Sequence, residues 1–335
     1  MSVVIPVLNE EHTIVPLLRA LRRQTYPVGL IEVVIADGGS LDATREMIQG
    51  YASRHPELAI RLEENPSGSV PAGLNVAVAR SSGEIVVRLD GHSEPFPDYI
   101  ERCVAALAAG LGDNVGGRWK VLPSREGAVS AAIAFAAVHT LGAGDARYRT
   151  GGEAGPVDTV PFGAYRRSTF EAVGPYDETL LANEDYEWNV RLRASGGCVW
   201  FDGDIQCVYR PRETYRALGR QYFRYGFWKF RMLLGAPESM RLRQAAPPAA
   251  LMLAATLGVA SRRRPLARVA LGTLAGAYTA ALGRAGLAAS QGTGDRQLTA
   301  GVPVALATMH LSWATGFLSS GLLETVRRMP RPSER

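Results

Sequence analysis

Cysteine is scarce in this 335-residue sequence, which has three cysteines and no pair with CxxC spacing. An odd count argues against a disulfide framework of the kind that stabilises small secreted domains. Cys198 and Cys207 could form one bridge, but small buried thiols in a reducing compartment are the favoured interpretation. No secretory signal is visible because an apolar strand follows Met1 at once, so we expect the folded part to stay in the cytosol.

Two common nucleotide-binding patterns are also missing. No GxxxxGK[ST] run occurs, which excludes a phosphate loop of the ATP-binding type. GxGxxG is absent after the first predicted strand, which disfavours a nicotinamide cofactor. A nucleotidyltransferase would be expected to carry a Gly-rich loop with Lys or Arg at that point, and Leu8-Asn9-Glu10-Glu11 is not such a loop.

Positive charge is unevenly spread along the chain. The formal net charge is +5, yet residues 1–211 carry −8, residues 212–243 carry +6 and residues 244–335 carry +7. With 47% hydrophobic and 21% charged residues, the composition is that of a folded protein. An acidic first part followed by basic, apolar parts is not a nucleic-acid-binding pattern. It predicts a water-soluble domain tethered to an anionic membrane surface.

Strands and helices alternate over the acidic part. Apolar runs predict strands at 3–7, 31–36, 59–63, 85–89 and 157–167. Helices are expected at about 11–23, from 41, and at 74–81, 96–110, 125–141 and 184–194. Such alternation is typical of a mostly parallel α/β sheet with helices on both faces. The Gly-rich stretch at 142–156 is either a surface loop or a lid over a substrate.

Acidic side chains follow two of the predicted strands, where parallel sheets bind their ligands. Asp37 ends one strand, and Asp90 and His92 occupy the turn after another. A carboxylate and an imidazole two residues apart are well placed for a divalent cation, which a diphosphate leaving group needs as charge builds up on it. Oxygen ligands suit Mg²⁺ or Mn²⁺, and an imidazole favours Mn²⁺. A hydrogen-bonding role in the turn is the alternative for His92.

Several segments together resemble one enzyme family. Segments 2–11, 36–44, 89–92 and 183–185 are similar, in sequence and in order, to the motifs of family 2 glycosyltransferases with the GT-A fold. Segments 184–193, 209–212, 221–226 and 309–316 are similar to bacterial succinoglycan-type exopolysaccharide glycosyltransferases. The resemblance implies a GT-A catalytic domain at 1–211, a basic interfacial helix region at 212–243 and membrane-associated helices at 244–335.

The resemblance also implies roles for matching residues. Donor-binding residues would be Pro6, Val7, Asn9, Glu10, Asp37, Gly39, Asn75, Asp90, Gln221 and Arg224. Asp37 would hydrogen-bond the base, with uracil expected. Asp90 and His92 would hold Mn²⁺ or Mg²⁺ together with the diphosphate. Asp185, with Glu184 beside it, would be the general base that deprotonates an acceptor hydroxyl, and attack opposite the diphosphate would invert the anomeric configuration.

Two positions depart from the family's pattern. His92 replaces the second aspartate of the usual Asp-x-Asp, which leaves the metal preference open. Tyr225 follows Arg224, so the Gln-x-x-Arg-Trp of processive polymerases is only partly matched. With few membrane helices as well, we expect transfer of one sugar per encounter rather than a channel-forming synthase.

The basic region at 212–243 predicts a helix at the level of lipid headgroups. Arg212, Arg216, Arg220 and Arg224 recur every fourth residue and form one stripe, with aromatic residues interleaved. Amphipathic aromatics next to arginines suit an interfacial helix. An ordinary solvated charged face is the alternative.

Uncharged stretches follow at 245–260, 269–283 and 297–323, and the last exceeds the roughly 20 residues that cross a bilayer. We expect two crossings, at about 266–290 and 298–322, with 245–260 in the near leaflet. The positive-inside rule would keep two groups of arginines cytosolic. These are Arg262–Arg264 and the group Arg327, Arg328, Arg331 and Arg335. Soluble core helices are the alternative for all three stretches.

The expected activity is an inverting, metal-dependent transfer of a sugar from a nucleotide-diphosphate donor, with UDP expected, to a hydroxyl of a lipid-linked glycan. It would take place at the cytosolic face of the inner membrane, in exopolysaccharide or cell-surface glycan assembly. Membrane lipids are expected partners and nucleic acid is not. Two alternatives stay open: transfer directly to polyprenyl phosphate, and a catalytically silent, membrane-anchored scaffold.

Overall fold

The computed structural model describes residues 1–328 and divides the chain into two compact units. The sheet unit comprises residues 1–120 and 146–209, and the helical unit comprises residues 121–145 and the chain from Arg210 onward. The segment 121–145 was expected within the catalytic domain. It belongs to the helical unit because its helix α5 (Ala128–Val138) packs against α13 (Leu298–Arg328). Arg331 and Arg335, expected to be cytosolic, lie outside the described residues.

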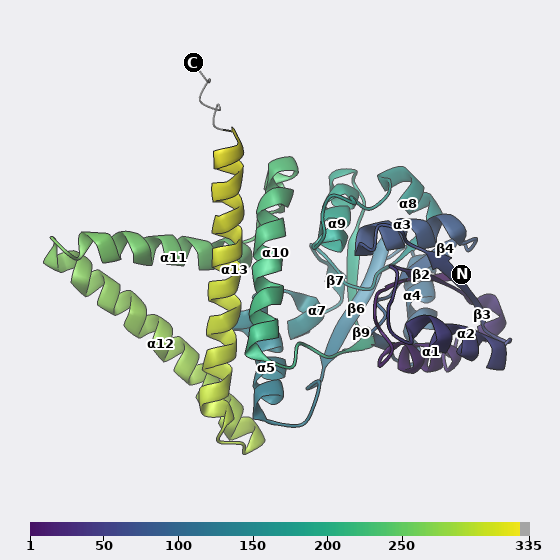
Figure 1. Ribbon diagram of the computed structural model, residues 1–335, viewed down its shortest axis with the longest axis horizontal. Helices are drawn as coiled ribbons and strands as arrows, with labels where there is room; N and C mark the ends of the chain where they lie inside the picture. Colours follow the sequence, from purple (N-terminus) through teal and green to yellow (C-terminus); the bar gives the residue numbers. More distant parts are fainter. Residues whose placement is uncertain (329–335) are drawn as a thin grey trace. The chain divides into compact units, whose positions relative to one another are not determined.

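One mixed sheet forms the centre of the sheet unit (Figure 1). Its strands are β1 (Ser2–Val7), β2 (Glu32–Asp37), β3 (Ala59–Glu64), β4 (Ile85–Arg88), β5 (Glu94–Pro95), β6 (Asn114–Val121), β7 (Gly155–Pro156), β8 (Ala164–Arg166) and β9 (Val199–Tyr209). They lie in the order β3-β2-β1-β4-β8-β6-β9-β5, with β7 paired to β9.

Strands β1 to β4 confirm the parallel pairing that the sequence predicts, whereas the later strands pair differently. Strands β1 to β4 pair in parallel, but β4 with β8, β6 with β8 and β5 with β9 pair antiparallel. The sheet is therefore mixed rather than mostly parallel. The strand expected at 157–167 is confined to β8, because the chain bends at Phe162, whose φ of 53° breaks an extended run.

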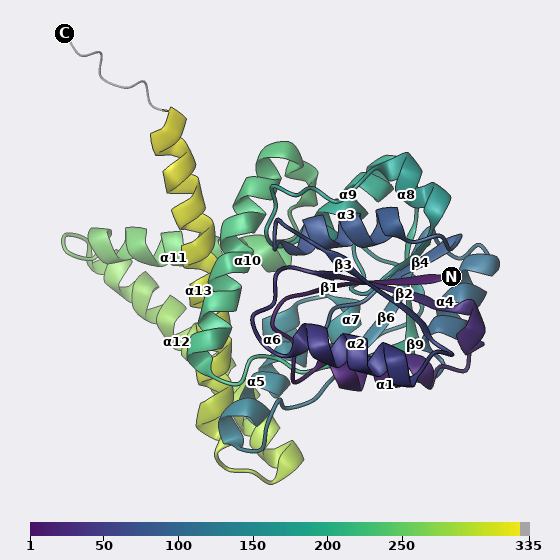
Figure 2. The same cartoon turned by 45° about the vertical axis from the view of Figure 1, so that its right-hand side comes forward.

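Helices cover both faces of this sheet (Figure 2). They are α1 (Ile14–Arg22), α2 (Thr44–Arg54), α3 (Val70–Arg80), α4 (Tyr99–Ala108), α7 (Arg147–Thr150), α8 (Arg167–Val173) and α9 (Glu184–Ala194). Alternating side chains of β1 explain the two layers: Val3 and Ile5 join the core formed with α1 and α4, whereas Val4 joins the core formed with α3 and α9. The apolar face predicted for the first helix is fully buried and consists of Ile14, Leu17, Leu18 and Leu21.

The Gly-rich stretch at 142–156 is more regular than predicted. It contains the end of α6 (Thr140–Ala143), all of α7 and the short strand β7. Gly144 and Gly151, with φ of +62° and +80°, end α6 and α7, because glycine adopts this backbone region without steric cost. The stretch also passes from one unit to the other, so a lid over a substrate stays a prediction.

The three cysteines are free thiols. Cys103 and Cys207 are buried and Cys198 is partly exposed. Burial raises the pKa of each thiol above its ordinary value, so all three stay protonated and unreactive near neutral pH. The bridge considered between Cys198 and Cys207 does not form, and the interpretation as small buried thiols holds for two of the three.

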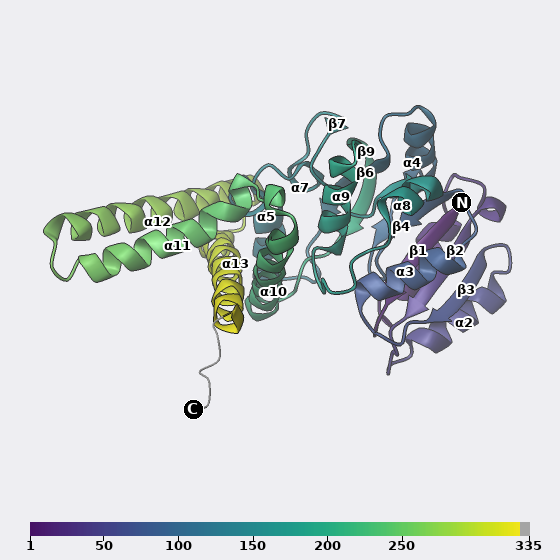
Figure 3. The ribbon, with the colours of Figure 1, turned by 90° about the horizontal axis from the view of Figure 1, so that it is seen from above.

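The helical unit is built around α13. The other main helices are α5, α10 (Tyr215–Gly235), α11 (Leu242–Ala260) and α12 (Pro265–Thr293). All four pack against α13, and its core includes Leu218, Leu306 and Met309. Helices α11 and α12 form a hairpin that extends away from α10 and α13 (Figure 3).

Helices α10 and α13 approach each other closely because glycines face backbone where they cross. A Cβ at Gly226 would overlap the carbonyl oxygen of Trp313, and a Cβ at Gly316 would overlap that of Phe223. Only glycine fits at such a distance. The crossing joins segments 221–226 and 309–316, which the sequence singles out as family-like.

The expected interfacial helix has its apolar face covered by protein. Arg216, Arg220 and Arg224 are exposed on α10, as the stripe predicts, but Leu218 and Tyr222 are buried in the core with α13. Among the described helices α12 is long and apolar enough to cross a membrane, by length and composition. The second expected span, 298–322, lies in α13, which does not meet that description and packs against α10, α11, α12, α5 and α6.

Candidate functional site

The carboxyl ends of β1, β2 and β4 meet at one edge of the sheet. Val7 pairs with Asp37 at the ends of β1 and β2, and Val4 pairs with Arg88 at the end of β4. The turns that follow these strands therefore lie together, as expected for parallel strands. They carry most of the residues that the sequence predicts for donor binding, including Pro6 and Val7 in β1 itself.

Asn9 holds the first two of these turns together. Its side-chain oxygen accepts from the backbone N–H of Leu41 at 2.9 Å, and its own N–H donates to Ser40 Oγ at 2.9 Å. Asn9 adopts a φ of +56°, which asparagine tolerates better than most residues, and Gly39 adopts +83°. The structure thus gives Asn9 and Gly39 a role in shaping the turn, and their contact with a donor stays a prediction.

Asp37 is buried and forms an ion pair. Its carboxylate lies 2.8 Å from Arg45 Nη1 and accepts from Ser40 Oγ at 2.5 Å. The predicted hydrogen bond from Asp37 to a nucleotide base must therefore be made beside Arg45, whose guanidinium is the partly exposed member of the pair.

Glu10 and His92 connect the turn after β1 with the turn after β4. His92 Nδ1 lies 3.0 Å from Glu10 Oε1, and the Glu10 N–H donates to Thr44 Oγ1 at 2.7 Å. Gly91 permits this approach, since a Cβ there would lie 3.0 Å from both Glu10 Cγ and Val7 Cγ1. A carboxylate that fixes one imidazole nitrogen is a common way to orient a metal-binding histidine.

A buried arginine gathers the acidic residues of the site. Arg88 Nη2 lies 2.8 Å from Asp90 Oδ1 and 3.0 Å from Glu184 Oε1, and Arg88 Nη1 lies 3.4 Å from Asp185 Oδ2. Its guanidinium also stacks over the ring of Phe162, 5.6 Å from the centroid. One side chain thus joins the turn after β4 to the start of α9, almost a hundred residues later in the chain.

Helix α9 begins where the sequence predicts. Asn183 caps it in the left-handed region, with φ of +66°, and both Glu184 and Asp185 lie in the first turn, where the helix dipole favours negative charge. Asp185 Oδ1 accepts from the Tyr186 N–H at 2.7 Å. The Asp185 side chain is 30% exposed and that of Glu184 only 10%, so Asp185 is the carboxylate that an acceptor can reach.

Burial changes the protonation of this pair. Burial, and then the charge of Asp185, raises the pKa of Glu184 to about 7. Burial also raises the pKa of Asp185, although Arg88 opposes the shift. The pKa of Arg88 lies above its ordinary value because Asp90, Asp185 and Glu184 outweigh the effect of its burial. Glu184 is therefore partly protonated near neutral pH, and the less buried Asp185 is the candidate base.

The residues present fit a divalent cation that arrives with a diphosphate. Among residues 1–328, no three His, Cys, Asp or Glu side chains are grouped closely enough to hold a metal ion by themselves. Asp90 and His92 offer a carboxylate and an imidazole, and Asp90 Oδ1 is buried without a hydrogen bond of good geometry, even to Arg88. Magnesium and manganese commonly take one or two protein ligands and complete their coordination with phosphate and water.

Three predicted donor residues are not brought into this cluster. Asn75 uses both amide hydrogens on Tyr176 O and Glu178 Oε1, each at 2.9 Å, so contact with a donor would have to displace one of them. Gln221 and Arg224 lie on α10 in the helical unit, where Gln221 Nε2 donates to Tyr225 OH at 3.0 Å. Their contact with a donor stays a prediction.

Arg88 is the site residue that sequence reasoning missed. A signal was present, because Arg88 is the one charged side chain inside the apolar run at 85–89, and a buried charge requires partners. The pattern could not show that those partners come from a helix that begins at Glu184.

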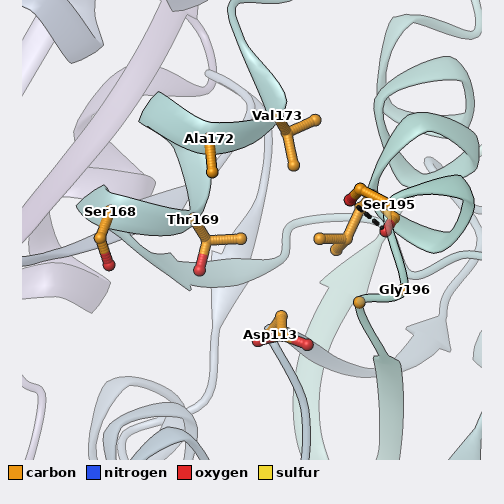
Figure 4. A pocket seen from close by; sticks show the side chains of 9 residues that line it. Asp113, Ser168, Thr169, Ala172, Val173, Ser195 and Gly196 are labelled. Atoms are coloured by element: carbon orange, nitrogen blue, oxygen red, sulfur yellow. Dashed lines mark hydrogen bonds between the residues drawn. The ribbon is translucent and has the colours of Figure 1, made fainter.

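A separate cavity of about 380 Å³ lies at the opposite end of α9 (Figure 4). Asp113, Thr169, Val173 and Ser195 are among its lining residues. None of the predicted site residues lines it, and it faces the carbonyl end of α9 rather than the end that carries Asp185. The cavity is therefore distinct from the cluster around Arg88.

Comparison with known proteins places this geometry in a family. The pattern of glycosyl transferase family 2 matches residues 2–174. The chain is 34% identical over 333 residues to the succinoglycan biosynthesis protein ExoA of Rhizobium meliloti, covering 98% of this chain and 96% of that protein. It is 32% identical over 133 residues to an undecaprenyl-phosphate 4-deoxy-4-formamido-L-arabinose transferase of Pseudomonas aeruginosa, covering 37% of this chain and 39% of that protein.

The fold has relatives among solved structures. The mannosyltransferase PcManGT of Pyrobaculum calidifontis, solved with GDP-Man and Mn²⁺, superposes with a TM-score of 0.65 at 21% identity over 95% of this chain and 86% of that one. This similarity confirms the expected GT-A fold. Because the family pattern matches more than half of the sequence and the rhizobial relative matches nearly all of it, the chain belongs to glycosyl transferase family 2.

Proposed function

We propose that this enzyme transfers one sugar from a nucleotide-diphosphate donor to a hydroxyl of a lipid-linked glycan, with inversion at the anomeric carbon. The observation that carries the proposal is the cluster around Arg88. It holds Asp90, at the turn where the diphosphate is expected, near Asp185, the carboxylate that an acceptor can reach. A base and a leaving-group site on either side of one guanidinium are the elements that a single displacement requires.

In the proposed step Asp185 accepts the proton of the acceptor hydroxyl. The acceptor oxygen attacks the anomeric carbon, the bond from that carbon to the diphosphate breaks, and its electron pair leaves with the nucleoside diphosphate. Attack from the side opposite the leaving group produces inversion. When bound, a divalent cation supplies charge neutralisation at the diphosphate, and Asp90 and His92 are the residues that would hold it.

Glu184 has a supporting role in this proposal. Its carboxyl lies 3.0 Å from Arg88 and is more deeply buried than that of Asp185. A protonated Glu184 leaves the charge of Arg88 to Asp90 and Asp185, which favours an ionised base. Asp37 and Arg45 together would recognise the nucleotide base, with uridine as the expected nucleoside.

The names of two relatives support the proposed acceptor class. One relative is named for succinoglycan biosynthesis, which supports a role in exopolysaccharide assembly, and another is named as an undecaprenyl-phosphate sugar transferase, which supports a lipid-linked acceptor. The cytosolic face of the inner membrane follows from a nucleotide-sugar donor, which is made in the cytosol. Transfer directly to polyprenyl phosphate is the second candidate, and its support is weaker because the relative named for that acceptor matches 37% of the chain.

The test is nucleotide release by the purified full-length chain with a panel of UDP- and GDP-sugars. Each donor is combined with either polyprenyl phosphate or a polyprenyl-diphosphate-linked sugar, with Mn²⁺, with Mg²⁺ or with excess EDTA. We expect product on the glycosylated lipid with a UDP-sugar and a metal ion. Product on polyprenyl phosphate alone supports the second candidate, undiminished turnover in EDTA contradicts the metal requirement, and no release with any donor favours the silent scaffold.

Two variants test whether Asp185 is the general base. Asp185→Asn should abolish transfer while the donor still binds, because the amide keeps the shape but cannot accept the proton. Asp204→Asn changes an exposed aspartate of the same unit and should leave the rate unchanged. Retained turnover in Asp185→Asn would contradict the proposal.

A further inference from the structure

We infer that Asn75 is a positioning residue, which holds Asp185 in place through the linker between α8 and α9 and does not bind the donor. This linker comprises residues 174–183 and leads directly into the first turn of α9, which carries Asp185. The effect of Asn75 on the rate rests on the proposed role of Asp185 as the base. The contact between Asn75 and the linker stands independently of that role.

The side-chain amide of Asn75 binds the linker with most of its hydrogen-bonding capacity. Its Oδ1 accepts from the backbone N–H of Tyr176 at 2.9 Å. Its Nδ2 donates to the carbonyl oxygen of Tyr176 and to Glu178 Oε1, each at 2.9 Å. A primary amide has two donor hydrogens and an oxygen with two acceptor sites. Both hydrogens are therefore in use, and a phosphate of a nucleotide-sugar donor, which only accepts hydrogen bonds, would have to displace one of them.

The burial of Tyr176 makes these hydrogen bonds important for the linker. Tyr176 is 4% exposed, and its ring packs in the core with that of Trp188 in α9, with 5.9 Å between the ring centroids. Asn75 binds both backbone polar groups of Tyr176 at a position that water hardly reaches. Because a buried N–H and C=O are costly to leave without partners, loss of the amide should make the linker rearrange.

Helix α9 binds the start of the same linker. Trp188 Nε1 donates to the carbonyl oxygen of Gly174 at 3.0 Å, and Arg191 Nη2 donates to that of Pro175 at 2.7 Å. Asn75 and α9 therefore hold consecutive residues of one short segment. A shift of this segment is transmitted to α9, because the helix is hydrogen-bonded to it.

The end of the linker determines where α9 begins. Leu180 and Ala182 are buried, and Asn183 turns the chain into α9 with a φ of +66°. Non-glycine residues adopt this backbone region only when the surrounding structure fixes it. Asp185 follows two residues later, so a change at Tyr176 reaches it through few bonds. Misplacement of a reacting group by about 1 Å can lower a rate about 10²-fold.

Helix α3, which carries Asn75, begins beside the expected nucleotide site. Ser69 caps α3, and a Cβ at Gly38 would lie 3.1 Å from Gly68 Cα, so the chain that enters α3 packs against the turn after Asp37. A helix rises 1.5 Å per residue, which places Asn75 about 8 Å along the axis from the first residue of α3. One helix thus contacts the nucleotide turn at its start and holds the linker further along.

Three variants of the full-length chain test the inference. Asn75→Asp removes both donor hydrogens and places a second negative charge beside Glu178. In Asn75→Asp/Glu178→Gln the amide and the carboxylate change places, so the contact between the two side chains can form in the reverse direction. Gln49→Glu makes the same amide-to-carboxylate change at an exposed position of α2 and is the matched control.

The first measurement separates turnover from nucleotide binding. With the substrates that support nucleotide release, Asn75→Asp should lower kcat at least about tenfold, and the double variant should recover at least about threefold of that loss. Calorimetric affinities for UDP and GDP with Mn²⁺ should change less than about twofold, and Gln49→Glu should match the unmodified chain throughout. A loss of nucleotide affinity of more than about tenfold in Asn75→Asp, or a double variant no faster than the single one, overturns the inference.

The second measurement is hydrogen exchange of the amides of residues 176–186, without donor or acceptor. Exchange should be faster in Asn75→Asp than in the unmodified chain, slower again in the double variant, and unchanged in Gln49→Glu. Equal exchange in Asn75→Asp and the unmodified chain overturns the inference, whether or not the enzyme is active. The expected exchange pattern in a chain that releases no nucleotide supports the contact and counts against the proposed function.

Discussion

Removal of the Arg88 guanidinium should damage both the stability of the sheet unit and the acid side of its pH–rate profile. The substitution Arg88→Gln keeps some length and hydrogen-bonding capacity but removes the charge. It leaves Asp90, Glu184 and Asp185 facing one another around a buried position without a cation. The consequence for each quantity follows from the geometry.

The loss of stability is set by burial. Arg88 is 5% exposed and lies within 3.4 Å of three carboxylates, and breaking a buried ion pair by removing one partner costs about 3–5 kcal/mol. The loss should be greatest at high pH. Glu184 has a raised pKa of about 7 in the folded chain against an ordinary 4.5, so at lower pH its bound proton removes one uncompensated charge.

The effect on rate has a definite sign. A base must be ionised to accept a proton, and loss of a neighbouring positive charge makes ionisation harder. The acid limb of the profile should therefore move to higher pH in Arg88→Gln. Arg88→Lys restores a charge but lacks the planar guanidinium that reaches several carboxylates. The acid limb should therefore return part of the way to its original pH, while the stability stays reduced.

The loss of stability is measured by chemical denaturation at pH 6 and pH 8, monitored by tryptophan fluorescence, and by hydrogen exchange of the β4 amides. The position of the acid limb is measured by the rate of nucleotide release from pH 5 to pH 9. Arg102→Gln is the matched control, because Arg102 pairs with Asp98 on an exposed helix surface and its loss should change neither quantity. An Arg88→Gln variant as stable as this control, with an unmoved acid limb, would refute the reasoning.

Three further outcomes are expected. For Glu184→Gln, the stability relative to the unmodified chain should increase by roughly 1–3 kcal/mol between pH 5 and pH 8. The unmodified chain loses stability over this range because its folded state must release the proton of Glu184, and the variant has no such proton; parallel stability–pH curves would contradict this. For His92→Asp, donor-dependent binding titrations should show a smaller preference for Mn²⁺ over Mg²⁺, with the exposed His12→Asp as control; an unchanged preference would remove His92 from the metal site. For Gly316→Ala, thermal unfolding should show destabilisation of the helical unit by more than about 1 kcal/mol, whereas Gly276→Ala, where a Cβ meets nothing, should be neutral or stabilising; equal effects would contradict the close crossing.

The sequence predicted the parallel half of the sheet well because that half is governed by local pattern. The run at 3–7 is buried on both faces and continuously apolar, and the runs at 31–36 and 85–89 are interrupted only by Glu32 and Arg88, which makes these three visible without knowledge of their partners. The edge strand at 59–63 is partly exposed and gives a weaker signal. The antiparallel half is different. Strands β5 and β7 have two residues each and are defined by pairing with β9, so no local signal could locate them.

The candidate site was predicted in its individual residues but not in its connections. Strand ends and the start of α9 are local features, and they located Asp37, Asp90 and Asp185. The contacts that Arg88 makes across nearly a hundred residues, and the bonds that occupy the Asn75 amide, depend on tertiary packing. Neither the spacing of residues nor their type determines such contacts.

Hydropathy alone could not decide how the tail helices meet lipid, for a related reason, and the two expected crossings stay a prediction. An apolar run shows that a helix can leave water, but its neighbours determine whether it enters lipid or packs against protein. The apolar residues of α13 pack against α5, α10 and α12, and the first half of α10 carries the exposed Arg216, Arg220 and Arg224. The exposed arginines of α10 lie beside part of α13, and a charged side chain is costly at the centre of a bilayer, so a crossing by α13 would have to keep these arginines at the level of the headgroups. The same argument leaves the α11–α12 hairpin, whose apolar side chains have no protein neighbour, as the part of the helical unit best suited to lipid.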